Sequence, residues 1–158
     1  MRAWLALMLL IGASAREARA EAGDDSCATL RRFIAAARAE PPFSTIPPSY
    51  FEQGHGFFGL AWPCRLETAP RALRCRQYVT HDREAEIMAD ETARCLPEAR
   101  RAPDESAEDG VRNGRRIYPY YRARFHLPGL DIEIFRGGNP AHHLGQFVTY
   151  RIARNPPR

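Results

Sequence analysis

Lysine is missing from this chain, so all 23 of its basic residues are arginines. This absence is typical of a GC-rich bacterial genome, in which arginine codons are common. It also has a physical consequence, because the planar guanidinium group of Arg can bind a carboxylate or a phosphate through two hydrogen bonds at once, whereas the ammonium group of Lys acts as a point charge. A surface that gathers these arginines is therefore suited to anionic partners.

Several motifs that carry common chemistries are also missing. The chain has no Cys-x-x-Cys pair, which disfavours both a zinc site and a thioredoxin-like redox centre. It has no serine in a Gly-x-Ser-x-Gly setting and no glycine-rich phosphate-binding loop. Since no coherent set of catalytic residues and no cofactor motif remains, the sequence favours a protein that binds over one that catalyses, and we predict no cofactor.

A third absence is a long hydrophobic run. Residues 3–13, AWLALMLLIGA, form the one sizeable apolar stretch, and it is shorter than the ~20 residues that a bilayer-spanning helix needs. Arg2 precedes this stretch, and two A-x-A sites follow it, ending at Ala15 and Ala20, as in a secretory signal peptide. We therefore predict that residues 1–20 are a signal peptide cleaved near Ala20 or Ala15, with an amphipathic N-terminal helix as the alternative.

The expected mature chain, residues 21–158, is long enough for a single small domain with one core. Removal of residues 1–20 takes away three Arg and one Glu, which lowers the formal net charge from +4 to +2. No cysteine lies where a lipid anchor would be attached. The sequence thus predicts a bacterial protein that is periplasmic or secreted and does not span the membrane.

Four cysteines remain in this mature chain: Cys27, Cys64, Cys75 and Cys95. An even number in an exported protein predicts two disulfides. A turn near residues 69–70 would place Cys64 almost opposite Cys75, and a bridge between them would leave Cys27 to pair with Cys95. In the alternative, each strand cysteine is joined to a helix cysteine, and the sequence alone leaves this choice open.

The periodicity of apolar residues predicts an α+β domain. These residues recur at helical spacing in residues 26–39 and 83–96, and they alternate with polar residues in five segments that we expect to be strands. The five segments are residues 57–66, 72–80, 120–127, 130–135 and 144–152. The order α-β-β-α-β-β-β predicts two helices packed on one face of an antiparallel sheet of about five strands.

Two segments show no such period. The proline-rich connector, residues 41–56, is expected to run over the surface. Residues 97–116 mix charges of both signs, and we expect a flexible loop there.

Two acidic pairs, Asp90-Glu91 and Asp104-Glu105, belong to no motif and are expected to be solvated surface charge.

The sheet face that the helices leave uncovered is the main candidate site. Alternation assigns to it seven residues that we predict to bind a partner: Arg74, Arg76, Tyr78, Tyr120, Arg122, Arg124 and Arg151. His126 and Phe147 share this face, and only Asp131 and Glu133 oppose its positive charge. Arginines can pair with anionic groups while aromatic rings pack against flat or apolar ones. The alternative is a solvated face on which the arginines pair with Asp131 and Glu133 across the strands.

The histidines form a weaker candidate site. His142 and His143 are adjacent in the loop GGNPAHHLG, whose glycines and Asn-Pro pair already account for a turn. A metal site needs three or four converging ligands, and His55 and His126 are the available helpers, with Glu52 or Asp131 in reserve. Glu52 and His55 could instead act as an acid–base pair. We predict no metal site, and a metal-dependent or histidine-based hydrolase stays as an alternative function.

These observations predict a small exported binding module, such as an inhibitor or an immunity-type protein. Its expected partner is an acidic protein or an anionic envelope glycan, because nucleic acid is an unusual partner outside the cytoplasm. A structural envelope component is a further alternative. If the face binds as predicted, replacing Arg122 and Arg124 with Glu abolishes binding and lowers thermal stability little.

Overall fold

The computed structural model describes residues 26–47, 56–57, 60–61, 64–68, 71–79, 83–108, 110–112, 115–117, 119–137 and 146–155. The predicted signal peptide, residues 1–20, lies outside these ranges, and so do Glu52, His55, His142 and His143. Within the described ranges, no helix has both the length and the apolar character needed to cross a membrane.

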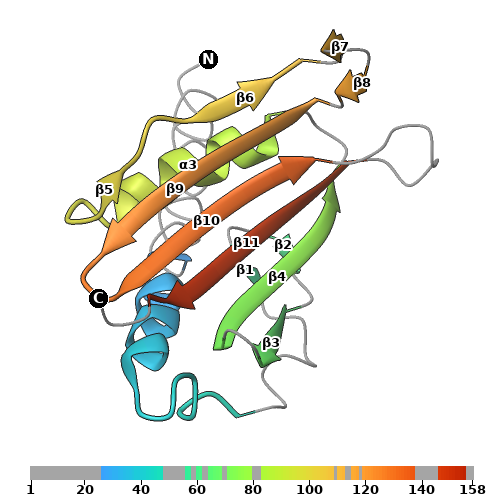
Figure 1. Ribbon diagram of the computed structural model, residues 1–158. Coiled ribbons are helices and arrows are strands. Elements are labelled where there is room, and N and C mark those ends of the chain that lie inside the picture. Colours follow the sequence, from blue (N-terminus) through green and yellow to red (C-terminus); the bar gives the residue numbers. More distant parts are fainter. Residues whose placement is uncertain are drawn as a thin grey trace, which may run out of the picture.

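A seven-stranded antiparallel sheet forms the centre of the fold (Figure 1). Its strand order is β3-β4-β11-β10-β9-β5, and β6 also pairs with β9. The strands are β3 (Cys64–Thr68), β4 (Arg71–Val79), β5 (Arg100–Arg101), β6 (Glu105–Ala107), β9 (Tyr120–Leu127), β10 (Leu130–Gly137) and β11 (Gln146–Arg154). Two further pairs lie apart from this sheet: β1 (Gly56–Phe57) with β2 (Leu60–Ala61), and β7 (Gly110–Arg112) with β8 (Arg115–Ile117).

Strands β9 and β10 follow the alternation in the sequence. Every second residue of β9 is buried, namely Tyr121, Ala123, Phe125 and Leu127, and the residues between them are half-buried. A tight turn at Pro128-Gly129 joins β9 to β10, and Gly129 adopts a φ of 74°, which glycine reaches without a steric penalty. The predicted inward and outward faces of these two strands are therefore confirmed.

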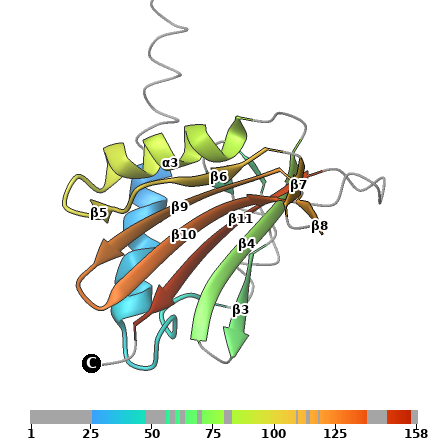
Figure 2. The same ribbon diagram turned by 45° about the horizontal axis from the view of Figure 1, so that its top comes forward.

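In the described part of the chain, two helices lie on one face of the sheet (Figures 1 and 2). Helix α3 (Glu84–Cys95) runs along β9 and β10, and the helix over residues 26–38 crosses behind the sheet near the turn between these strands. Both helices bury apolar residues in the same core as the inward side chains of the sheet. The core also holds a polar contact, because Thr92 Oγ1 lies 3.1 Å from the hydroxyl oxygen of the buried Tyr150. The predicted α+β class is confirmed.

Two disulfides connect these elements. Cys27–Cys95 joins the two helices across a sequence separation of 68 residues, and Cys64–Cys75 joins β3 to β4 across a separation of 11. In the sheet register, Cys64 lies directly opposite Cys75. This is the pairing that a turn near residues 69–70 produces, so the choice left open by the sequence is resolved.

The sheet has more strands than the five predicted, because residues 97–116 add to it. Strands β5 and β6 pair with the outer edge of β9, and β7 pairs with β8. Backbone hydrogen bonds hold such short edge strands, so they form without the apolar alternation that the sequence reading requires. The prediction of one continuous strand over residues 57–66 is wrong as well, since β1, β2 and β3 are separate there.

Part of the proline-rich connector is buried, which corrects the expectation that it runs over the surface. Phe43 and Ile46 belong to the core. The backbone N–H of Phe43 donates a hydrogen bond to the carbonyl oxygen of Ala36 at 2.7 Å, and Phe43 has a φ of 62°. The chain therefore folds back against the end of the first helix and inserts two apolar side chains beneath the sheet.

Candidate binding face

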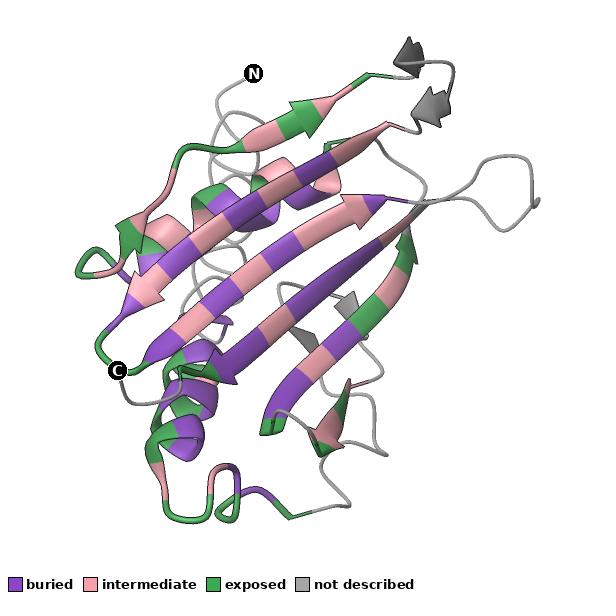
Figure 3. Cartoon of the chain, in the orientation of Figure 1, coloured by how far each residue is buried: buried purple, intermediate pink, exposed green. Residues whose placement is uncertain are grey.

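The predicted binding residues share the sheet face that points away from the helices, and we call this surface the open face. Residues directly opposite each other in a sheet have side chains on the same face. Register places Arg74, Arg76 and Tyr78 of β4 opposite Arg151, Thr149 and Phe147 of β11. Glu133 of β10 lies opposite both Arg151 of β11 and Arg124 of β9. Along β9, Tyr120, Arg122, Arg124 and His126 alternate with buried residues, a banding that Figure 3 shows.

The open face carries more arginines than carboxylates. Among the described strands, register assigns it seven arginines: Arg65, Arg74, Arg76, Arg100, Arg122, Arg124 and Arg151. It assigns four carboxylates: Glu67, Glu105, Asp131 and Glu133. Seven against four leaves a surplus of three positive charges. The sequence reading missed Glu67 and Glu105, because it did not recognise β6 or the end of β3 as strand.

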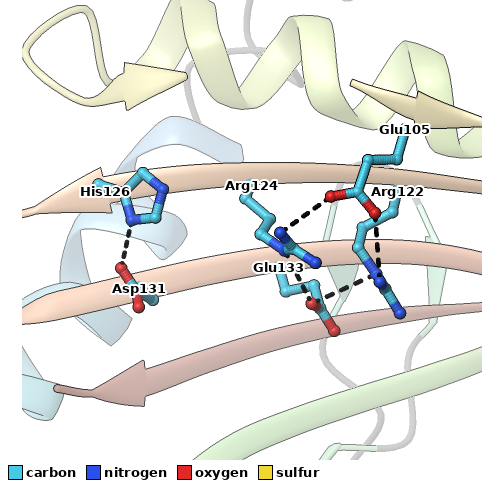
Figure 4. A network of polar contacts seen from close by, with 6 residues as sticks. All are labelled: Glu105, Arg122, Arg124, His126, Asp131 and Glu133. Atoms are coloured by element: carbon cyan, nitrogen blue, oxygen red, sulfur yellow. Dashed lines mark hydrogen bonds and ion pairs between the residues drawn. The ribbon is translucent and has the colours of Figure 1, made fainter. Parts of the chain in front are cut away.

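Four of these arginines form ion pairs with carboxylates, and we call this region the ion-paired zone: Arg74, Arg122, Arg124 and Arg151. Arg124 Nη1 lies 2.9 Å from Glu105 Oε1, and Arg122 Nη1 lies 3.4 Å from Glu105 Oε2. The Nε atoms of both arginines lie 3.5 Å from Glu133 Oε2 (Figure 4). Arg74 and Arg151 share Glu67 at 2.9 and 3.0 Å. Glu105 is therefore not the solvated charge that we expected, since it links β6 to β9.

His126 is the described member of the predicted histidine site, and it pairs with a carboxylate. Its Nδ1 atom lies 2.7 Å from Asp131 Oδ1 of the neighbouring strand (Figure 4). In the described part of the chain, no group of three His, Cys, Asp or Glu side chains is placed to hold a metal ion. The other members of that site, Glu52, His55, His142 and His143, lie outside the described residues.

Four aromatic residues cross the other end of the open face, and we call them the aromatic band: Tyr120, Phe135, Phe147 and Tyr78. The rings of Tyr120 and Phe135 stack with centroids 6.4 Å apart, and those of Phe135 and Phe147 are 6.2 Å apart. Tyr78 lies opposite Phe147 in register and is 60% exposed. The band thus runs over β9, β10, β11 and β4 at the end of the sheet where β9 begins.

Arg76 lies within this band and differs from the arginines of the ion-paired zone. Its Cζ atom is 3.8 Å from the centroid of the Phe147 ring, which is a close cation–π contact. No carboxylate among the described residues forms an ion pair with Arg76. Arg122 borders both regions, because its Cζ atom also lies 5.2 Å from the centroid of the Phe135 ring.

Gly137 makes room for the central ring of the band. A Cβ atom at this position would lie 2.6 Å from Cζ and 2.8 Å from Cε1 of Phe135. The ring of Phe135 therefore occupies the space that a side chain at position 137 would need. The sequence reading explained Gly137 by the following turn, whereas the structure places it in β10 opposite Phe147.

A polar cluster on the helix side of the sheet fixes the segment that carries β5 and β6. Arg101 donates hydrogen bonds to both oxygens of Asp104 at 3.0 and 2.6 Å, and to Asp90 of α3 at 2.9 Å. The hydroxyl of Tyr121 donates to Asp104 Oδ2 at 2.6 Å. Neighbouring residues of an extended segment point to opposite sides. Anchoring Asp104 on the helix side therefore turns Glu105 towards the open face.

The electrostatics of this cluster favour the ionised form of Asp104. Burial opposes its ionisation, but the hydrogen bonds from Arg101 and Tyr121 and the charge of Arg101 outweigh burial, so the pKa of Asp104 lies below its usual value. Burial, together with the hydrogen bond to Asp104 and its charge, raises the pKa of the Tyr121 phenol. Asp104 is thus a structural anchor, which corrects the expectation of solvated charge.

Comparison of the chain with models of known protein families, with curated proteins and with solved structures finds no match. Inference of function therefore rests on the residues of the open face.

Proposed function

We propose that this chain is a small exported binding module, of the inhibitor or immunity type, that holds an acidic protein or an anionic envelope glycan on its open face. The observation that carries the proposal is the surplus of arginines among aromatic rings on a sheet face that no described helix covers. Arg and Tyr are among the residue types that most often anchor interfaces. Two disulfides are compatible with an oxidising compartment outside the cytoplasm.

The ion pairs leave some arginines of the open face more available to a ligand than others. Arg74, Arg122, Arg124 and Arg151 have carboxylate partners within the chain, so a ligand gains little from them unless it displaces those partners. Arg65, Arg76 and Arg100 form no ion pair with a described carboxylate. These three supply the charge that remains for an anionic partner.

Two exposed apolar residues on opposite layers provide a direct test. Tyr78 of the open face is 60% exposed, and Ile87 of α3 is 54% exposed. A photo-crosslinking amino acid is introduced at either position, and the protein is irradiated in the cells that produce it. We expect adducts from position 78 and none from position 87, and the adduct mass distinguishes a protein from a glycan.

Adducts from position 87 alone would move the interaction to the helix layer and contradict the proposal. Absence of adducts from position 78 would contradict binding at the open face. No contact among the described residues favours the alternatives, a hydrolase or a structural envelope component, over binding.

A further inference from the structure

We propose that Arg76 is the anchor of the open face, that it receives a carboxylate of an acidic protein, and that Tyr78 packs against an apolar part of the same partner. This inference rests on the proposed function and narrows it in two respects. It selects one arginine among seven, and it selects a protein rather than a glycan as the occupant.

Arg76 is held in place before any ligand arrives. With its Cζ atom 3.8 Å from the centroid of the Phe147 ring, the guanidinium group lies over the ring face. A guanidinium fork that is already oriented loses less conformational entropy when it forms two hydrogen bonds to a carboxylate. Arg76 is exposed and has no described carboxylate partner, so a ligand does not need to displace one.

The other arginines of the open face are less suited to this role. Arg74, Arg122, Arg124 and Arg151 are held by Glu67, Glu105 and Glu133 at distances between 2.9 and 3.5 Å. Arg65 and Arg100 are exposed, but no contact with a described aromatic ring orients them. Charge complementarity therefore points to Arg76 as the place where an anionic group of a partner binds.

The aromatic band favours a protein over a sugar chain. A glycan platform needs open ring faces, whereas here Phe147 lies between Arg76 and Phe135. Phe135 in turn covers Gly137 and is flanked by Tyr120, Phe147 and the guanidinium group of Arg122. Tyr78 remains as the exposed aromatic residue beside Arg76. The pair of Arg76 and Tyr78 is suited to a carboxylate that lies next to an apolar side chain. Acidic proteins carry such neighbouring groups on their surfaces.

The test uses two polymeric probes that share the carboxylate group and differ in backbone. Poly-L-glutamate and polygalacturonate are titrated into the purified protein at equal carboxylate concentration, and the Kd is measured by calorimetry. The variants are Arg76→Glu, Arg76→Lys and a matched control, Arg71→Glu, which changes the charge equally at an exposed position of the same strand.

We expect poly-L-glutamate to bind more tightly than polygalacturonate. Arg76→Glu should weaken this binding about tenfold or more, and Arg76→Lys should weaken it severalfold, because Lys keeps the charge and loses the planar fork. Arg71→Glu should change the Kd by no more than about twofold, since the charge it reverses lies away from the contact. Unchanged thermal unfolding confirms that each variant is folded.

Three results would overturn the inference. Equal losses in Arg76→Glu and Arg71→Glu would show a diffuse charge effect, and full binding by Arg76→Lys would show that the oriented fork is unimportant. Tighter, Arg76-dependent binding of polygalacturonate would assign the site to a glycan. Crosslinks from position 78 that persist in Arg76→Glu would leave the proposed function standing and remove Arg76 from it.

Discussion

In the ion-paired zone the arginines of the open face pair with carboxylates, whereas in the aromatic band Arg76 lies over the ring of Phe147. Both arrangements hold a guanidinium group in place. A carboxylate uses its N–H donors, while a ring contacts its flat face and leaves the donors available. Two arginines two residues apart on β4 therefore differ in their contacts: Arg74 pairs with Glu67, whereas Arg76 keeps its N–H donors available for the partner that we propose.

The largest expected difference between the two regions is in stability. Replacing both Arg122 and Arg124 with Glu places two new carboxylates against Glu105 and Glu133. Because attraction becomes repulsion at several contacts, we expect the free energy of unfolding to fall by about 2–3 kcal/mol, measured by urea denaturation. This revises the expectation from the sequence that stability changes little.

A charge swap is the control for that experiment. Adding Glu105→Arg and Glu133→Arg to the double variant restores opposite charges and should recover most of the lost stability. A double variant as stable as the parent would show that the ion-paired zone does not hold β6 and β10 to β9.

The next largest effect concerns the anchor that positions Glu105. Asp104→Asn removes the charge of the carboxylate that accepts hydrogen bonds from Arg101 and Tyr121. We expect the free energy of unfolding to fall by about 1–2 kcal/mol near pH 7. The pKa of Asp104 in the folded protein lies below its usual 3.8. The stabilisation is therefore fully present above the unfolded-state pKa and is lost as the pH falls through the lower folded-state value.

Unfolding by urea at pH 7 and at pH 3 measures this dependence. The difference in stability between the parent and Asp104→Asn should be smaller at pH 3 than at pH 7. A difference that stays constant between these two pH values would argue against an ionised Asp104 as the source of the stabilisation.

A smaller effect is expected from Gly137→Ala, which tests how the aromatic band is built. The new Cβ atom would meet the Phe135 ring at 2.6 Å, so the ring must swing away from β10. The strain is partly offset by the lower unfolded-state entropy of Ala, and we expect stability to change by no more than about 1 kcal/mol. The near-UV circular dichroism of the aromatic residues should change clearly, and an unaltered spectrum would contradict the described packing.

The smallest effect on stability is expected for Arg76→Ala. This change removes one exposed cation–π contact, and the free energy of unfolding should fall by no more than about 0.5–1 kcal/mol. Urea denaturation beside the Arg122/Arg124 double variant makes the comparison direct. A loss as large as that of the double variant would mean that Arg76 is also a structural residue.

The sequence predicts the long strands well because their side chains alternate. The outward positions of Tyr120, Arg122, Arg124 and His126 follow directly from the period of two in β9. The same period in β4 places Arg74, Arg76 and Tyr78. The residues expected on the open face are therefore found there, although their binding role stays a prediction.

The carboxylates that divide this face could not be found in the same way. Glu105 lies in a strand of three residues held by backbone hydrogen bonds to β9, and nothing in its local sequence signals that pairing. Glu67 meets Arg151 across a sequence distance of 84 residues, so only the tertiary fold brings them together. Gly137 and Phe135 are only two residues apart in the sequence. The need for a glycine at position 137 still cannot be predicted from them, because Phe135 belongs to an aromatic band whose other rings come from neighbouring strands.

The position of strand β11 in the sheet has a further consequence for folding. It lies between β4 and β10 in the sheet, yet it follows both of them in sequence. As the chain folds, the β3–β4 and β9–β10 hairpins stay separate until residues 146–154 join them. Each hairpin exposes an open edge during that interval, and open edges promote aggregation. The sheet is thus complete only when β11 lies between β4 and β10, so this one strand covers both exposed edges.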